Sequence, residues 1–358
     1  MCIVAAWDEQ IINILLVQRE ILGILRRFVN TSGIAGLAVI KKGDSQPDAT
    51  WLPSAISKEP TFLAYSITKT VIAVLFVQFT EEGRLDLEDP LARWFPDVPQ
   101  SQQISLRQLL SHTAGVPDYG PLPQYHEAVR RSPSKPWSFE RFAAETFDKG
   151  LLFAPGSGWA YSNPGYMLLK SIAQKVTATP LSRLVSERIV RPLELRTMFV
   201  PESIEDLSSL APARSRALSV DGTVRDVREH YHPGWVSHGV VASTPSDMTR
   251  FLDGLFHHRL ISKQSLDQMI ALVPVPVTRS PEDRIGKPGY GLGLMGDPES
   301  PWGPVWGHNG GGPGYSASAF FVPQLGDVSA CAMVATGDEE FDAKDLVYEV
   351  LDLLAGTA

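Results

Sequence analysis

The sequence predicts an α/β protein of the α+β type, in which one sheet is assembled from both ends of the chain and a mainly helical lobe lies between them. Strand-like apolar runs gather near both ends, and helical segments separated by Pro- and Gly-rich loops fill the middle. At 358 residues the chain is also long for a single core. We therefore expect a discontinuous α/β domain at residues 1–86 and 285–358, a mainly helical domain at 87–284, and an active site in the cleft between them.

The first part of the chain predicts a helix, a strand and a second, buried helix. Apolar side chains recur at helical spacing over residues 11–25, and residues 36–40 form an apolar run that predicts a strand. Residues 44–60 are rich in Pro and Ser and predict a loop with a short strand. Residues 67–82 contain neither Gly nor Pro and are apolar on nearly every side, which predicts a buried helix. Gly83 suits the left-handed position that ends it.

The middle of the chain predicts short helices, and the tail predicts strands. Thr244 begins a helix as its cap, with Pro245 at the first helical position and the acidic Asp247 at the third. Other helices are expected at residues 104–111 and 181–191. The expected tail strands are 290–294, 305–308, 317–322 and 328–335, followed by an amphipathic helix at 343–354.

Composition and charge exclude several classes of protein. Hydrophobic residues make up 44% and charged residues 20% of the chain, as in ordinary globular proteins. A net charge of −8 and the absence of a basic cluster argue against a nucleic-acid partner. The two cysteines, Cys2 and Cys331, have no disulfide or metal-site spacing, so we expect no metal, and Cys331 lies in an apolar run typical of a core.

The N-terminal sequence predicts neither a secretory signal nor a membrane anchor. Asp8 and Glu9 stand where a signal peptide has basic residues, and the apolar run at 11–17 is too short to cross a bilayer. We therefore expect a cytoplasmic protein without a membrane partner. Nothing in the sequence sets the oligomeric state.

Ser66 and Lys69 form the first candidate catalytic pair. They are three residues apart at the head of the buried helix, so they share a face, and Ser66 is expected at the N-cap. A serine hydroxyl needs a base to become a nucleophile. Lysine can act as that base when burial or nearby cations lower its pKa. The free N–H groups and the dipole at a helix start also favour an oxyanion.

The Ser-x-x-Lys pattern is short, and chance also produces it. A second copy, Ser132-x-x-Lys135, occurs in this chain. Prolines at 133 and 136 exclude a helix interior there, so its two side chains need not face each other. Two further motifs in the chain support the interpretation of Ser66 and Lys69 as a catalytic pair.

Those motifs are Tyr161-Ser162-Asn163 and the Gly-rich stretch from Trp306 to Tyr315. Tyr161 can relay protons and Asn163 can both donate and accept, from what we expect to be a loop. Taken on its own, the first motif is explained better by a turn with a packed tyrosine. In the second, His308 follows a strand-like run, and the glycines permit close approach of backbone N–H groups to an oxyanion. A hydrogen-bonded loop histidine is the alternative.

In this order, the three motifs resemble the serine β-lactamase and penicillin-binding-protein superfamily. The chain is most similar to the branch of class C β-lactamases, DD-peptidases, D-aminopeptidases, D-amino-acid amidases and family VIII-type carboxylesterases. Other stretches similar to this branch are Leu109–Gly115, Phe153–Gly156 and Ser243–Met248. The resemblance covers the chain from about residue 30 and implies a β-lactamase/transpeptidase-like fold, with an antiparallel sheet flanked by helices.

The resemblance also implies roles for single residues. Ser66 would be acylated, Lys69 would take its proton, and Tyr161 would act with Lys69 and activate water in deacylation. Asn163 would orient the substrate and Lys69, while His308 would line the site where many relatives have lysine. The backbone N–H groups of Ser66 and Gly311 would form the oxyanion hole, with Gly310 beside them. No cofactor is implied.

The third motif, His308-Asn309-Gly310, departs from the Lys-Thr-Gly or Lys-Ser-Gly of class C lactamases. The hydroxyl and the fixed cation that help hold a β-lactam carboxylate are missing, and each lost charge-assisted hydrogen bond costs roughly 1.5–3 kcal/mol. We therefore expect a serine hydrolase for small esters, amides or short peptides, with D-amino acid derivatives a leading option. A carboxylesterase with weak β-lactamase activity, for which Trp306 near the motif is typical, is one alternative. A penicillin-binding-like sensor or scaffold that is acylated without turnover is another.

Overall fold

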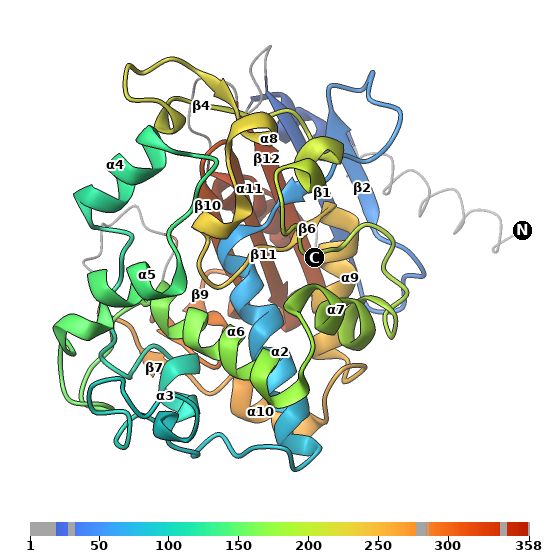
Figure 1. Ribbon diagram of the computed structural model, residues 1–358. Helices are drawn as coiled ribbons and strands as arrows, with labels where there is room; N and C mark the ends of the chain where they lie inside the picture. Colours follow the sequence, from blue (N-terminus) through green and yellow to red (C-terminus); the bar gives the residue numbers. More distant parts are fainter. Residues whose placement is uncertain (1–18, 28–32, 277–283, 285, 337–341, 357–358) are drawn as a thin grey trace, which may run out of the picture.

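The architecture was analysed in a computed structural model, which describes residues 19–27, 33–276, 284, 286–336 and 342–356. Within these residues, eight strands form one sheet in the order β2-β1-β12-β11-β10-β9-β8-β7, and the paired neighbours run antiparallel. The early strands therefore lie beside the last one, as predicted (Figure 1). The strands are β1 (Ile34–Ile40), β2 (Asp48–Leu52), β7 (Val273–Pro274), β8 (Gly289–Tyr290), β9 (Met295–Ser300), β10 (Gly303–Gly312), β11 (Tyr315–Val322) and β12 (Val328–Ala335).

The sheet separates two hydrophobic cores because its side chains alternate between two faces. In β12, Ala330, Ala332 and Val334 enter one core, while Cys331 and Met333 enter the other. The first core also contains α11 (Ala343–Gly356) and part of the helical segment at 19–27. The second contains α2 (Thr68–Glu81), α9 (Pro245–Phe256) and the helical middle of the chain. Cys331 is buried, as expected of a core residue.

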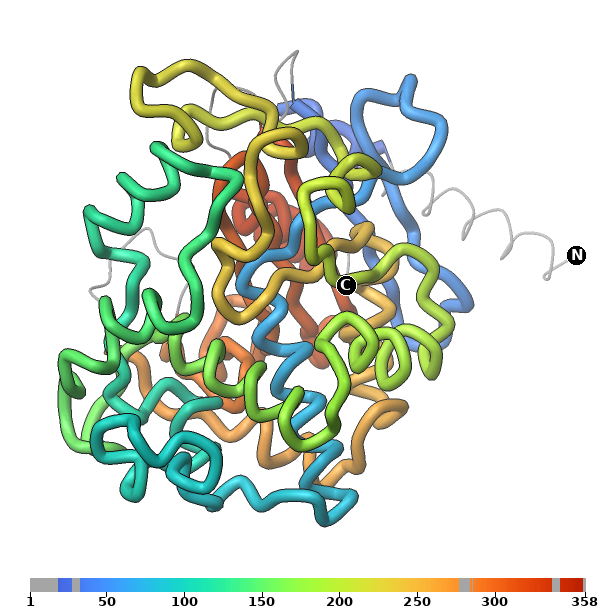
Figure 2. Tube along the Cα trace, in the orientation of Figure 1, coloured from blue at the N-terminus to red at the C-terminus, as the bar shows by residue number. Residues whose placement is uncertain are grey.

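The helical middle wraps around α2, as the continuous trace in Figure 2 shows. Ser105 and Gln108 form a reciprocal capping box on one of these helices, and Thr244 caps α9 by accepting from the N–H of Asp247. Among the described helices, none combines the length and the apolar composition that a bilayer crossing requires. The helices of this region are α3 (Leu106–Leu110), α4 (Pro123–Arg131), α5 (Phe139–Glu145), α6 (Asn163–Thr177), α7 (Leu181–Val185), α8 (Val227–His230), α9, and α10 (Lys263–Met269).

Helix α2 crosses the centre of the molecule and is buried on all sides, as its apolar composition predicted. Of its 14 residues, 11 are buried, including the polar Thr68, Lys69 and Thr70. Gly83 follows its C-cap with φ +67°. The amides of Gly83 and Arg84 return to the last turn of the helix, to the carbonyls of Thr80 and Phe79.

Two predictions about the tail need correction. The expected strand at 290–294 is paired only at Gly289–Tyr290, because the chain turns at Gly293, where φ is +70°. Strand β9 at Met295–Ser300 was missed, because its Gly-Asp-Pro-Glu sequence lacks the β-branched residues typical of strands.

The predicted amphipathic helix at 11–25 lies partly outside the described residues. The division into two domains at 86 and 285 stays a prediction, and β7 joins the sheet from before that second boundary.

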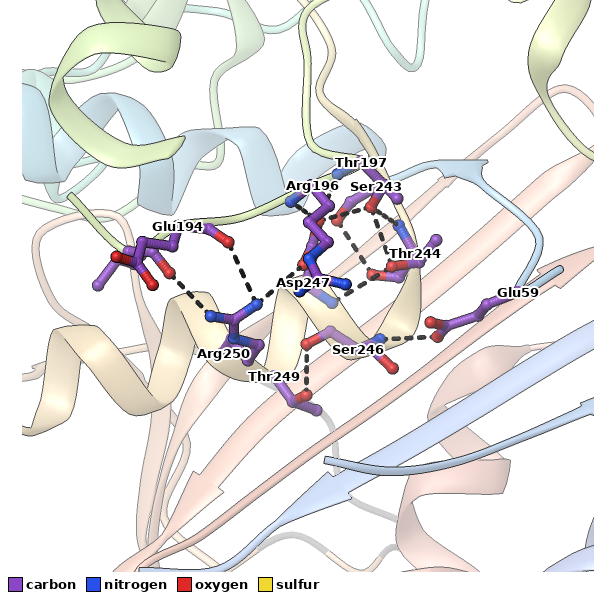
Figure 3. A network of polar contacts seen from close by, with 11 residues as sticks. Glu59, Glu194, Arg196, Thr197, Ser243, Thr244, Ser246, Asp247, Thr249 and Arg250 are labelled. Atoms are coloured by element: carbon purple, nitrogen blue, oxygen red, sulfur yellow. Dashed lines mark hydrogen bonds and ion pairs between the residues drawn. The ribbon is translucent and has the colours of Figure 1, made fainter. Parts of the chain in front are cut away.

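A polar network fixes the strand that leads to Ser66. Strand β3 (Phe62–Leu63) pairs with β6 (Ala242–Ser243), and α9 follows directly after β6. At the start of α9 the Asp247 carboxylate accepts from the N–H groups of Arg196 and Thr197 and from the Thr197 hydroxyl (Figure 3). Glu59 accepts from the Ser246 N–H at 2.9 Å. The network therefore ties α9, β6 and the segment before β3 into one unit.

Gly293 limits how closely the sheet packs on α2. A Cβ at this position would lie 2.5 Å from the Ala73 Cβ and 2.8 Å from the Lys69 carbonyl oxygen. We predict that Gly293→Ala lowers the free energy of unfolding by more than Gly222→Ala does. Gly222 shares the left-handed backbone, which alone costs about 1–2 kcal/mol, but has open space around it. Urea unfolding of both variants measures the difference, and equal losses would show that the packing is not limiting.

Candidate active site

Ser66 lies in a tight turn and does not cap the helix, contrary to our expectation. It belongs to the 3₁₀ turn Tyr65–Ile67, and α2 begins at Thr68 with Ile67 as its N-cap and no side-chain capping bond. The hydroxyl is therefore not used by the helix. It accepts instead from Lys69 Nζ at 3.2 Å and from the Tyr161 hydroxyl at 2.7 Å.

The backbone before Ser66 is strained and held by close packing. Tyr65 has φ +43°, a conformation that costs a non-glycine residue about 1–3 kcal/mol. Its ring is buried and its hydroxyl donates to the Pro313 carbonyl at 2.8 Å. Gly310 of β10 passes so close that a Cβ there would lie 2.1 Å from the Ala64 carbonyl oxygen and 3.0 Å from the Ser66 nitrogen. Strand β10 therefore packs directly against the turn that carries Ser66 and limits its movement.

Lys69 is fully buried and has three polar neighbours. Its Nζ donates to Ser66 Oγ and, at 2.7 Å, to Asn163 Oδ1, and lies 3.3 Å from His238 Nε2. The ammonium also lies 4.7 Å from the ring centre of Tyr161. Burial lowers the pKa of Lys69 to about 7, against the opposing charge of Asp118. Lys69 can therefore exist as a neutral amine, and so as a base, near neutral pH.

Asn163 connects Lys69 to a partly buried carboxylate, that of Asp118, which the sequence motifs did not reveal. It is the first residue of α6, which Ser162 caps, so only Tyr161 of this motif lies in the expected loop. The Asn163 side chain donates to both oxygens of Asp118 at 3.1 and 3.2 Å, and its backbone N–H donates at 3.0 Å. This fixes the amide so that its oxygen faces Lys69. Burial raises the pKa of Asp118, while the bonds from Asn163 and the charge of Lys69 lower it.

The Tyr161 ring packs beside Ser66 against a tilted histidine ring. Its ring centre lies 4.5 Å from that of His112, whose Nδ1 accepts from the Ser162 N–H at 3.1 Å. Burial raises the pKa of Tyr161, so the phenol keeps its proton in the resting site. Tyr161 can donate to Ser66 or relay a proton, whereas Lys69 is the group whose charge changes near pH 7.

His308 lies behind the site and not on the wall of the cavity, where we had expected it. Its Nε2 lies 2.9 Å from the Tyr290 hydroxyl, and its Nδ1 contacts the Asn309 carbonyl. Burial and the nearby Lys69 lower the pKa of His308 to about 3, so it stays neutral. Trp306 lies two residues before His308 on β10, and its ring contacts that of Phe256 at a centre distance of 6.3 Å. The third motif therefore brings no cation to the substrate.

A cavity of about 960 Å³ opens in front of Ser66. Gly310 and Gly311 form one side of it, and a Cβ at Gly311 would meet no atom within 4 Å, so this residue faces open space. Among the described residues, the remaining lining includes the arginines Arg130, Arg214 and Arg216 and several tyrosine rings. These ring residues are Tyr65, Tyr119, Tyr125, Tyr161, Tyr231 and Tyr315.

The structure thus gathers Ser66, Lys69, Tyr161 and Asn163 at one point, with Gly310 and Gly311 beside them. The antiparallel sheet with α2 packed on one face, and a Ser-x-x-Lys pair at the head of that helix, define the β-lactamase/transpeptidase class of fold. The family model described as Beta-lactamase matches residues 23–355, and the chain belongs to this family.

Relatives of this chain include a penicillin-binding protein and a D-alanyl-D-alanine-carboxypeptidase/endopeptidase. It is 28% identical over 273 residues to penicillin-binding protein 4* of Bacillus subtilis, covering 70% of this chain and 55% of that one. It is 28% identical over 192 residues to the D-alanyl-D-alanine-carboxypeptidase/endopeptidase AmpH of Escherichia coli, covering 52% and 46%. The chain spans about half the length of these curated relatives.

Two solved structures are similar over nearly the whole chain. A D-stereospecific amidohydrolase from Streptomyces sp. superposes with a TM-score of 0.77 at 29% identity, covering 91% of this chain and 96% of that one. A D-amino acid amidase from Ochrobactrum anthropi SV3 superposes with a TM-score of 0.78 at 25% identity, covering 95% and 99%. These likenesses support a hydrolase.

Sequence reasoning missed Asp118, His112 and His238. Asp118 follows the similar stretch 109–115 by three residues, and His112 lies inside it, but neither carries a spacing that indicates a contact with Lys69. His238 comes from a loop between the short 3₁₀ turn Pro233–Trp235 and β6. The second pair, Ser132 and Lys135, lies in a turn after α4 and not in a helix, as the prolines predicted.

Asp118 sets both the orientation of Asn163 and part of the charge balance of Lys69. We predict that Asp118→Asn lowers the pKa of Lys69 further, because the negative charge that favours its ammonium is removed. Carbon-13 NMR of labelled lysine side chains, followed against pH, measures this shift. Glu59→Gln, which removes a carboxylate bonded to Ser246, is the matched control and leaves the Lys69 titration in place. An unchanged titration in Asp118→Asn would contradict the assigned role.

Proposed function

We propose that the protein is a serine hydrolase that forms an acyl-enzyme on Ser66. Its substrates are small amides, esters or short peptides, with D-amino acid amides the leading option. The observation that carries this proposal is the position of Ser66 Oγ, 3.2 Å from the Nζ of a buried lysine and 2.7 Å from a phenol. A nucleophile and a base within hydrogen-bond reach, with a third group orienting the base, are what covalent acyl transfer requires.

Acylation follows from this geometry. Ser66 Oγ attacks the substrate carbonyl carbon while its proton passes to neutral Lys69. The carbonyl oxygen becomes an oxyanion, which the N–H groups of Ser66 and Gly311 stabilise on the open side of β10. The bond to the leaving nitrogen or oxygen then breaks, and that atom takes a proton from Tyr161, which Lys69 replaces.

Deacylation reverses these roles with water as the nucleophile. A water molecule on the cavity side of the ester gives its proton to the Tyr161–Lys69 pair as its oxygen bonds to the acyl carbon. Oγ of Ser66 leaves with a proton returned from Lys69. Each step of this scheme uses an amino-acid side chain, a backbone N–H group or water.

Three observations support amides of D-amino acids as substrates. The two similar solved structures are a D-stereospecific amidohydrolase and a D-amino acid amidase. The tyrosine rings in the cavity lining offer apolar surface to a substrate side chain, beside the charged Arg130, Arg214 and Arg216. His308 is neutral and faces Tyr290, so the third motif offers no cation to the carboxylate of a β-lactam. The proposed partner is thus a small molecule, not a nucleic acid or a membrane.

Two alternatives remain distinguishable by experiment. A carboxylesterase with weak β-lactamase activity has the same acylation chemistry, and a penicillin-binding-like sensor stops at the acyl-enzyme. Side-by-side turnover of short-chain p-nitrophenyl esters, nitrocefin and D-alanine or D-phenylalanine amides separates the first alternative from an amidase. A stoichiometric adduct on Ser66 without turnover of any of them identifies the sensor.

Ser66→Ala tests the nucleophile. We expect this variant to lose turnover by at least about 1000-fold while its unfolding transition stays in place, because the hydroxyl serves neither a cap nor the core. The unmodified chain, treated with a fluorophosphonate and measured by intact mass spectrometry, gains one adduct that maps to Ser66. Ser132→Ala, in the second Ser-x-x-Lys copy, is the control and keeps full labelling. Retained turnover in Ser66→Ala would exclude the mechanism.

The pKa of Lys69 predicts the pH dependence. Below about pH 7 Lys69 is an ammonium and cannot take the Ser66 proton, so kcat/KM falls as the pH drops below this value and levels off above it. Asp118 also acts on Lys69, and burial raises the pKa of its carboxyl group. The histidines and tyrosines around Lys69 keep one charge state through this range, because burial lowers the pKa of the histidines and raises that of the tyrosines. These groups are His112, His238, His308, Tyr161 and Tyr166. A rate profile that is flat from pH 5.5 to 8.5 would show that Lys69 is not the base.

A further inference from the structure

His238 contacts the proposed base but has no part in the scheme above. Its Nε2 lies 3.3 Å from Lys69 Nζ, the residue is 1% exposed, and its ring borders the cavity. Within the described residues, its Nδ1 has no hydrogen-bond partner. A buried polar ring that meets only one partner is unusual and needs a reason.

Lys69 Nζ has three hydrogen-bonding positions, and each of them is occupied by one of its three polar neighbours. As an ammonium it has three N–H groups and no lone pair, and Ser66 Oγ, Asn163 Oδ1 and His238 Nε2 take one each. As a neutral amine it has two N–H groups and one lone pair. Asn163 must take one N–H, because the bonds from its amide nitrogen to Asp118 leave only its oxygen facing Lys69. One N–H and the lone pair remain for Ser66 and His238.

The tautomer of His238 decides how these two are shared. With Nε2 unprotonated, His238 accepts the N–H and the lone pair points at the Ser66 hydroxyl. With Nε2 protonated, His238 donates into the lone pair, and Lys69 presents an N–H to Ser66 and cannot take its proton. The ammonium form admits only the first arrangement, because it has no acceptor to offer an Nε2–H.

We propose that His238, with its proton on Nδ1, is a positioning residue that directs the lone pair of neutral Lys69 to the Ser66 hydroxyl. This inference rests on the proposed role of Lys69 as base. Around His238 stand the Tyr166 ring, at a centre distance of 6.3 Å, and two cations, Lys69 and Lys170. Burial and these cations lower its pKa well below the ordinary value, so the ring stays neutral while Lys69 titrates.

Two variants test the proposal. His238→Leu keeps an apolar side chain of similar size but removes the acceptor, and His238→Gln offers an amide oxygen near the position of Nε2. In His238→Leu we expect the rate of Ser66 labelling by a fluorophosphonate, on the high-pH plateau, to fall by up to about tenfold, the value of a hydrogen bond between two neutral groups. Its acid limb also moves to lower pH, because the ammonium loses an acceptor. His238→Gln keeps the plateau rate within about twofold of the parent chain and leaves its acid limb in place.

Other outcomes overturn the proposal. A plateau and an acid limb in His238→Leu that match the parent show that the contact does not orient the amine. Equal losses in the Leu and Gln variants, with native circular dichroism, show that the ring only fills space. If the parent chain itself takes no label at Ser66, the proposed function fails, which separates that failure from this one.

Nitrogen-15 NMR of histidine in the parent chain gives an answer that needs no variant. We expect the His238 signals at pH 8 to show a proton on Nδ1 and an unprotonated Nε2, with assignment from the spectrum of His238→Gln. A proton on Nε2 at this pH overturns the proposal, because the lone pair of Lys69 would then be engaged by the ring.

Discussion

The burial of one lysine amine governs the arrangement of the site. Lys69 lies in the first turn of a helix that is apolar on every side, and none of its side chain reaches solvent. A buried ammonium is costly unless each N–H has a partner. The three acceptors around Nζ come from the 3₁₀ turn at Ser66, the start of α6 and the loop before β6. Three segments that are far apart in the chain therefore meet at Lys69 Nζ.

The same constraint explains the supporting residues. Asp118 accepts hydrogen bonds from the Asn163 amide nitrogen, which leaves the amide oxygen facing Lys69, so a partly buried carboxylate orients the group that contacts the lysine. The strained turn at Tyr65 is maintained from two sides, by the close approach of Gly310 and by the β3–β6 pairing that the Asp247 network supports. The segments behind Ser66 are therefore held rigidly by packing and hydrogen bonds, while the cavity in front of Ser66 is open.

The sequence was informative where a pattern is local and silent where a contact joins distant segments. Helix α2, the cap at Thr244 and the strands β1, β11 and β12 follow from periodicity and capping residues. Strand β9 has no such pattern in its own sequence, and it forms a strand because it pairs with β10. Ser66, Lys69 and Tyr161 were found from motifs, whereas Asp118 and His238 carry no signal apart from the atoms they meet in the folded chain. The N-cap prediction failed because Ser66 belongs to a 3₁₀ turn, which leaves its hydroxyl free for Lys69 and Tyr161.

The electrostatics of the site also bear on the kind of substrate it can take. Three buried histidines, His112, His238 and His308, surround Lys69, and its charge contributes to lowering the pKa of each. They therefore supply hydrogen bonds and ring surface without adding positive charge. A site of this kind has one proton to exchange near neutral pH, that of Lys69. A substrate whose binding depended on a buried cation next to the carbonyl would find that lysine already committed to Ser66, Asn163 and His238. The third motif therefore adds no positive charge beside Ser66, and the charged side chains that line the cavity in front of it include Arg130, Arg214 and Arg216.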